Sequence, residues 1–156
     1  MLPLRLCLIA ILRTVNQQEH DAGLATTPGY RYADLVGDQL FVAGQVPRDK
    51  SGELVGAADP AAQAISCLDN LRTLLNVHDF ADADIRRLIV YVVGEHQNLL
   101  DAWSAVTEWF AGDVPPATLL GVNLLQRSAR RDRCHSRETR GMTNRAVIAG
   151  VVRGPP

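Results

Sequence analysis

The sequence predicts a single α+β domain, in which two helices cover one face of a mixed β-sheet. Its length of 156 residues suits one domain. Hydrophobic residues make up 47% of the chain and charged residues 21%, so enough apolar side chains are present to form a core. Segments with strand-like and helix-like periodicity alternate along the chain, in the order strands, helix, strand, helix, strand.

A β-hairpin is predicted over residues 30–45. Residues 30–35 and 40–45 are rich in strand-forming side chains, and Gly37 and Asp38 between them are a typical turn pair. Gly44 is expected to end the second strand, because a residue without a Cβ lets the backbone bend or another group approach closely.

Two amphipathic helices are predicted. The first spans residues 60–77, with Asp59 as N-cap and Pro60 as first helical residue. Its expected inner stripe consists of Ala61, Ala64, Ile65, Leu68, Leu71 and Leu75. The second is expected to be capped by Asn98, with Asp101 in a capping-box position, and to end at Gly112. Its expected inner stripe consists of Leu100, Trp103, Val106, Thr107 and Phe110.

The remaining segments are predicted from composition. Residues 85–93 are rich in β-branched side chains and are expected to form a buried central strand. Residues 118–125 are expected to form the next strand. Residues 1–15 are predicted as an upstream strand rather than a signal peptide, because their apolar run is short and no cleavage site follows. Residues 16–27 are predicted to be a loop.

The cysteines indicate reduced thiols in the cytoplasm. Cys7, Cys67 and Cys134 are scattered, with no metal-binding spacing. His135 beside Cys134 supplies only two ligands, so no metal site is predicted.

Charge is distributed unevenly. Residues 1–126 carry eight basic and fifteen acidic side chains, a net charge of −7, whereas residues 127–156 carry eight arginines and two acids, a net charge of +6. Within the acidic part, Arg86 and Arg87 are interpreted as a small basic step at the start of a strand and not as a binding patch.

Five short motifs occur in the same order as in one known family. They are Pro28-Gly29-Tyr30, the strand ending in Gly44-Gln45-Val46-Pro47, Ser51-Gly52-Glu53-Leu54-Val55, Asp69-Asn70-Leu71 and Pro115-Pro116-Ala117. As a set they cover roughly residues 26–125 and resemble the RidA/YjgF family of reactive intermediate deaminases, also called L-PSP endoribonucleases. The resemblance implies a chorismate-mutase-like fold, assembled as a homotrimer with ligand clefts between subunits.

The resemblance also implies a reaction, the hydrolysis of enamines or imines to a carbonyl compound and ammonia without a cofactor. Family deaminases bind the substrate carboxylate with an arginine directly after the Pro-Pro-Ala motif. Thr118 stands at that position here, and the acidic residue of the family's last strand has no counterpart. The chain therefore resembles an arginine-lacking subgroup.

The candidate substrate-binding residues are carried over from the family or retained from the pocket that remains. They are Tyr30, Gly44, Gln45, Tyr91 and Thr118. Tyr30 and Thr118 are the candidate catalytic residues. Each also has a structural interpretation: an exposed hairpin aromatic for Tyr30, a strand-end glycine for Gly44, and packing for Tyr91.

The C-terminal tail, residues 126–156, departs from the family pattern. Three interpretations are open: a frameshifted reading of a GC-rich gene, a basic arm for nucleic acid or an acidic partner, and a diverged but folded end. The first predicts a family-like domain at residues 1–125 without its final strand, so that a central ladder loses hydrogen-bond partners. Only residues 146–152 have strand-forming composition.

Three function classes are consistent with the sequence. The first is an enamine or imine deaminase. The second is a non-catalytic, small-molecule-binding or chaperone-like trimer. The third is RNA binding or cleavage through the basic tail, because the acidic remainder would repel phosphate. No membrane association is expected.

Overall fold

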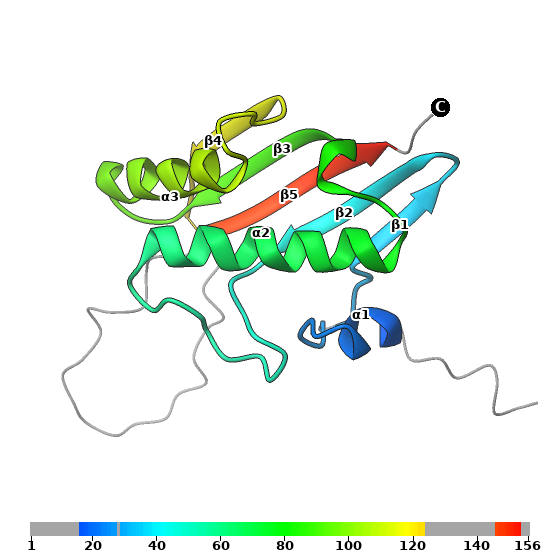
Figure 1. Cartoon of the computed structure of the whole chain (residues 1–156). Coiled ribbons are helices and arrows are strands. Elements are labelled where there is room, and N and C mark those ends of the chain that lie inside the picture. The colour runs from blue at the N-terminus through cyan, green and yellow to red at the C-terminus, as the bar shows by residue number, and fades with distance from the viewer. Residues whose placement is uncertain (1–15, 28, 124–145, 154–156) are drawn as a thin grey trace, which may run out of the picture.

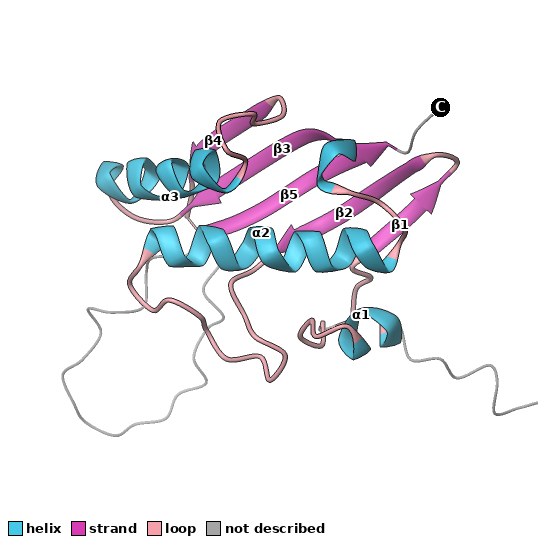
Figure 2. Cartoon of the chain, in the orientation of Figure 1, coloured by secondary structure: helices cyan, strands magenta, loops and turns pink. Residues whose placement is uncertain are grey.

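The computed structural model describes residues 16–27, 29–123 and 146–153. The elements are α1 (Gln17–Asp21), β1 (Ala33–Val36), β2 (Gln39–Gln45), α2 (Pro60–Val77), a 3-10 turn η1 (Asp82–Asp84), β3 (Ile85–Val92), α3 (His96–Trp109), β4 (Ala117–Gly121) and β5 (Ala146–Arg153). The strands form one sheet in the order β1-β2-β5-β3-β4 (Figure 1). Among the strands of the described residues, only the β3–β4 pair is parallel. Helices α2 and α3 lie on one face of the sheet, which confirms the predicted α+β class (Figure 2).

The predicted hairpin is present. β1 and β2 pair in antiparallel fashion up to Val36 and Gln39, with Gly37 in the left-handed region at φ +62°. The expectation that Gly44 ends β2 is wrong, because the strand continues to Gln45. The pairing of β2 with β5 shifts between Val42 and Gln45, so Gly44 lies in a β-bulge inside the strand.

The first predicted helix is confirmed at both ends. The Asp59 carboxylate accepts a hydrogen bond from the Ala62 N–H at 3.0 Å, and Pro60 occupies the first turn. The buried residues of α2 are Gln63, Ala64, Cys67, Leu68, Leu71, Leu74 and Leu75. Ile65 is exposed and does not belong to the inner stripe. The buried face of the helix includes Cys67 and Leu74, and at 3.6 residues per turn Ile65 lies outside that face.

The predictions for α3 were partly wrong. Gly94, at φ +136°, turns the chain directly after β3, so the helix begins at His96 with Glu95 as N-cap rather than at Asn98. Asp101 accepts a hydrogen bond from the Gln97 side chain and does not form a capping box. The buried residues of α3 are Ala102, Ala105 and Val106, whereas Leu100 is exposed. The small alanines face the core because α3 packs against α2.

The segment predicted as a loop at residues 16–27 contains the short helix α1. Leu24, which follows it, is buried and packs with Tyr32 and Leu74 in a small second core. The strand predicted at residues 118–125 ends at Gly121. The strand predicted at residues 1–15 lies outside the described residues.

The main core lies between the sheet and the two helices. Buried residues that point from the strands toward the helices are Leu40, Ile85, Leu88, Val90, Val92 and Ile148. Strand residues alternate between faces, so the opposite face carries Phe41 of β2, Ile89 and Tyr91 of β3, and Thr118 and Leu120 of β4. We call this second face the open face, because no helix among the described residues covers it.

The C-terminal part of the chain supplies the central strand. β5 pairs with β2 on one side and β3 on the other, and Ile148 is fully buried in the main core. The frameshift interpretation is therefore wrong in predicting that the final strand is missing, and the strand-forming composition of residues 146–152 agrees with β5. Residues 126–145, which include Cys134 and His135, lie outside the described residues.

The Asp69-Asn70 step connects α2 to two distant segments. The Asn70 side chain donates hydrogen bonds to the carbonyls of Val46 and Arg48, at 3.0 and 3.1 Å. The Asp69 carboxylate accepts a hydrogen bond from the Trp109 indole at 3.0 Å. This motif thus fixes the loop after β2 and the end of α3 to the same helix.

Truncation of the chain after residue 125 should prevent folding. The cut removes β5, so β2 and β3 lose the strand between them and Ile148 leaves the core. We expect an unfolded or aggregated product by circular dichroism and light scattering, whereas a chain cut after residue 153 should fold like the full chain. A folded 125-residue product would show that β5 is dispensable.

The Asn70→Ala substitution should lower the free energy of unfolding by about 1–3 kcal/mol, because two carbonyls lose a donor. Chemical denaturation measures the change. The control is Asn76→Ala, on the same helix at an exposed position for which the structure gives no side-chain hydrogen bond. An equal loss of unfolding free energy in the two variants would argue against a stabilising role of the Asn70 hydrogen bonds.

The Gly56→Ala substitution should destabilise the protein more than Gly37→Ala. Both glycines have positive φ, +63° and +62°, so both variants carry about 1–2 kcal/mol of backbone strain. Only at Gly56 would the new Cβ clash, at 2.8 Å from the Ala62 Cβ, whereas at Gly37 nothing lies within 4 Å. Denaturation midpoints of the two variants test this, and similar midpoints would contradict it.

Candidate functional site

Tyr30 lies at the rim of a hollow beside the β1 edge of the sheet. The side chain is 43% exposed. The hollow has a volume of about 360 Å³ and is lined by Asn16, Thr27, Gly29, Tyr30 and Arg31. The exposed phenol can therefore contact a small molecule.

The backbone of Tyr30 is held in place by two side chains. Its carbonyl accepts hydrogen bonds from the Asn16 amide at 2.8 Å and from the Thr27 hydroxyl at 2.5 Å. The side-chain oxygen of Asn16, Oδ1, in turn accepts a hydrogen bond from the Tyr32 backbone N–H at 2.9 Å. The main chain is thus fixed on both sides of Tyr30, while its phenol stays accessible.

The same segment is anchored to the C-cap of α2 by a hydrogen bond between side chains. Glu19 of α1 lies 3.0 Å from His78 Nε2, and both groups are largely shielded from solvent. Tyr32 donates its hydroxyl to the Ala25 carbonyl at 2.7 Å. Burial raises the pKa of the Tyr32 phenol to about 12, with smaller contributions from Tyr30 and Glu19. Tyr32 is therefore a neutral structural donor near neutral pH.

Sequence reasoning missed this support for Tyr30. The segment at residues 16–27 was interpreted as a loop, although Asn16 and Thr27 hold the Tyr30 carbonyl. A signal was present in the polar residue types, since Asn is among the residues that adopt positive φ, and Asn16 has φ +68°.

Thr118 and Tyr91 lie close together on the open face. Thr118 of β4 pairs with Ile89 of β3, and Tyr91, two residues further along β3, pairs with Leu120. The Thr118 side chain is exposed and Tyr91 is half-buried. The structure thus places these two predicted residues on adjacent strands, where both can contact one ligand.

Gly44 and Gln45 lie near the centre of the sheet. Gly44 lies in the bulge of β2. The Gln45 side chain is 1% exposed and donates a hydrogen bond to the Ala43 carbonyl at 2.9 Å. A ligand on the open face would not reach this side chain, which stabilises the bulge.

Tyr30 and Thr118 are not brought together within one chain. Tyr30 precedes β1 and Thr118 belongs to β4, and these strands are the two edges of the sheet. Four strand spacings separate the edges, a distance of about 19 Å. A site that uses both residues would have to combine them from different copies of the chain.

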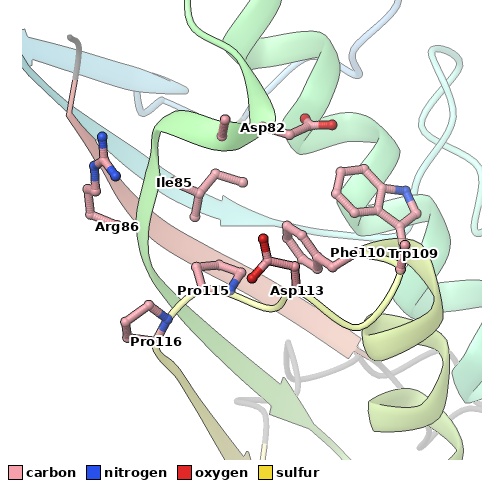
Figure 3. A pocket seen from close by; sticks show the side chains of 10 residues that line it. Asp82, Ile85, Arg86, Trp109, Phe110, Asp113, Pro115 and Pro116 are labelled. Atoms are coloured by element: carbon pink, nitrogen blue, oxygen red, sulfur yellow. The ribbon is translucent and has the colours of Figure 1, made fainter.

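A larger hollow of about 610 Å³ lies where β3 and β4 begin (Figure 3). Ile85, Trp109 and Phe110 supply apolar surface there. Pro115 and Pro116, which border it, lead into β4 and Thr118. Figure 3 shows the Asp113 carboxylate pointing toward the hollow from the segment after α3.

The described part of the chain contains no group of three or more His, Cys, Asp or Glu side chains that could hold a metal ion. Burial raises the pKa of the Cys67 thiol, so this cysteine is a poor nucleophile. Among the described helices, none is both long and apolar enough to span a membrane.

Comparisons with known proteins agree with this architecture. Residues 22–130 match the Endoribonuclease L-PSP family. A RutC family protein from Sulfurisphaera tokodaii is 27% identical over 88 residues, which cover 56% of this chain and 69% of that protein.

Solved structures share the fold at low sequence identity. The YjgF gene product from E. coli superimposes with a TM-score of 0.66 at 18% identity, covering 85% of this chain and 94% of that one. RidA from the Antarctic bacterium Psychrobacter sp. PAMC 21119 gives 0.66 at 16% identity, with the same coverage of both chains. TdcF from E. coli, solved with bound serine, gives 0.63 at 14% identity and covers 90% of this chain and 98% of that one. By its family match over most of its length, the chain belongs to the Endoribonuclease L-PSP family, the RidA/YjgF family.

Proposed function

We propose that this protein hydrolyses an enamine or imine to a carbonyl compound and ammonia, in a cleft completed between subunits of a homotrimer. The observation that carries the proposal is the fixed backbone and exposed phenol of Tyr30 at one sheet edge, with the exposed hydroxyl of Thr118 at the other. Each edge offers half of a site. Two neighbouring copies would bring the halves together.

The open face supports self-association. Val36, Phe41 and Leu120 are 58%, 45% and 44% exposed, although such large apolar side chains are usually buried. Exposed apolar patches commonly mark interfaces, and a second copy would remove this one from water. Packing of open faces around a threefold axis would place the β1 edge of one copy near the β4 edge of another.

The chemistry requires only groups that the chain provides. Water adds to the C=N carbon, and the tetrahedral product then expels ammonia, so one water is consumed and one carbonyl forms. The Thr118 hydroxyl can orient the water by hydrogen bonding. The Tyr30 phenol can transfer a proton to the departing nitrogen, the role of a general acid. No cofactor or metal is needed for these steps.

The relatives support a small-molecule ligand. TdcF from E. coli, which shares the fold at 14% identity, has been solved with serine bound. Thr118 carries no charge, so it cannot supply the ion pair that an arginine would make with a carboxylate. The chain therefore belongs, in this proposal, to an arginine-lacking subgroup whose substrate is held differently.

The Tyr30→Phe substitution should reduce ammonia release about 100-fold, because general acid–base groups typically contribute that much or more. Thr118→Val should reduce it about tenfold through loss of one hydrogen bond. Both are measured with imines that an amino acid oxidase generates in the assay. The control is Tyr32→Phe, which removes a buried structural hydroxyl and should lower stability but leave the rate unchanged.

Light scattering of the full chain should give the mass of a trimer. A stable monomer would contradict the completed cleft. A trimer that gains thermal stability from keto acids but releases no ammonia from any imine would favour the binding-only alternative. Ammonia release that survives both substitutions would place the chemistry elsewhere.

A further inference from the structure

Two arginines lie together beside Thr118. Leu88 of β3 points into the core and is fully buried, so Arg87 before it points to the open face, where it is exposed. Arg86 is also exposed, although simple alternation would turn it toward the helices. The exposure of two consecutive residues of β3 therefore requires a local irregularity in the strand.

A β-bulge provides this explanation. Ile85 pairs with Val152 of β5 and Arg87 with the adjacent Val151, so Arg86 is an extra residue on β3. Ile85 and Leu88 on either side are both buried, which leaves the two arginines outside the core. Figure 3 shows Arg86 on the opposite side of the β3 ribbon from Ile85.

The arginines are within reach of Thr118. Arg87 lies two residues before Ile89, the partner of Thr118 in the parallel β3–β4 pair. One strand spacing and two residues of rise separate their Cα atoms by about 8 Å, a distance that an arginine side chain can span. Arg86 borders the larger hollow, whose lining includes Pro115 and Pro116 before β4 but not Thr118 itself.

Neither arginine is neutralised by a described side chain. In the described part of the chain, Arg31 pairs with Asp34 and Arg72 with Asp82, but Arg86 and Arg87 have no ion pair. Asp113 also borders the hollow near Arg86 and forms no ion pair. Two adjacent unpaired guanidinium groups repel each other, and an anion that binds both relieves this repulsion.

We propose that Arg86 and Arg87 together bind the carboxylates of a dicarboxylic imino acid, and so replace the single arginine that Thr118 displaces. This inference rests on the proposed function and specifies its substrate class. Two cations match two carboxylates, whereas a monocarboxylate leaves one guanidinium uncompensated. Nucleic acid is a poorer match, because the described residues carry fifteen acidic side chains against seven basic ones and would repel a polyphosphate.

The test compares two keto acids, the products that a dicarboxylic and a monocarboxylic imine would give. Isothermal titration calorimetry of the full chain should show that 2-oxoglutarate binds at least ten times more tightly than pyruvate. Arg86→Gln and Arg87→Gln should each reduce this preference severalfold, and the double variant should abolish it. The control is Lys50→Gln, which removes one positive charge from an exposed loop outside the sheet.

The outcomes separate this inference from the proposed function. Ammonia release from imines without any preference for the dicarboxylate would overturn the inference and leave the function standing. A preference that depends on the arginines, without turnover of any imine, would support the inference and refute the function. Loss of the trimer in the arginine variants would also overturn the inference, because the arginines would then pair with a neighbouring subunit.

Discussion

The pairing of β5 between β2 and β3 is the constraint on which the rest of the structure depends. Without it, the hairpin β1–β2 and the parallel pair β3–β4 would be separate sheets. Ile148 joins the core residues beneath both halves, so the strand connects the packing as well as the hydrogen bonds. Its pairing also creates both bulges, at Gly44 on β2 and at Arg86 on β3. The C-terminal strand β5 thus determines which side chains the sheet presents.

Local signals made some elements predictable from sequence. Asp59 and Pro60 start α2 through interactions within one turn, so the residue types alone were sufficient. The start of α3 depends on the tight turn at Gly94, and its N-cap Glu95 lies three residues before the expected cap Asn98. The burial of Ala105 and the exposure of Leu100 follow from how closely α3 packs on α2, and no single segment encodes that distance.

In the candidate site too, residue types were predictable from the sequence, whereas the arrangement of the residues depends on contacts between distant segments. Tyr30, Tyr91 and Thr118 were identified by residue type and motif, and their accessibility in the structure is compatible with contact to a ligand. Their distribution across the sheet could not be deduced, because β5 enters the centre from a segment remote in sequence. Arg86 and Arg87 are a small basic step by sequence alone, and only the register with β5 shows that a bulge leaves both outside the core.

In the proposed site, anion binding does not require an arginine at position 118, because Arg87 lies on the neighbouring strand. A side chain on β4 and one two residues back on β3 project from the same face of a parallel pair, so a guanidinium group on β3 can reach the space beside position 118. The bulge at Arg86 adds a second charge that a regular strand would turn toward the helices. Because β5 imposes this bulge, the strand at the centre of the sheet and the charge beside the candidate site are consequences of one pairing.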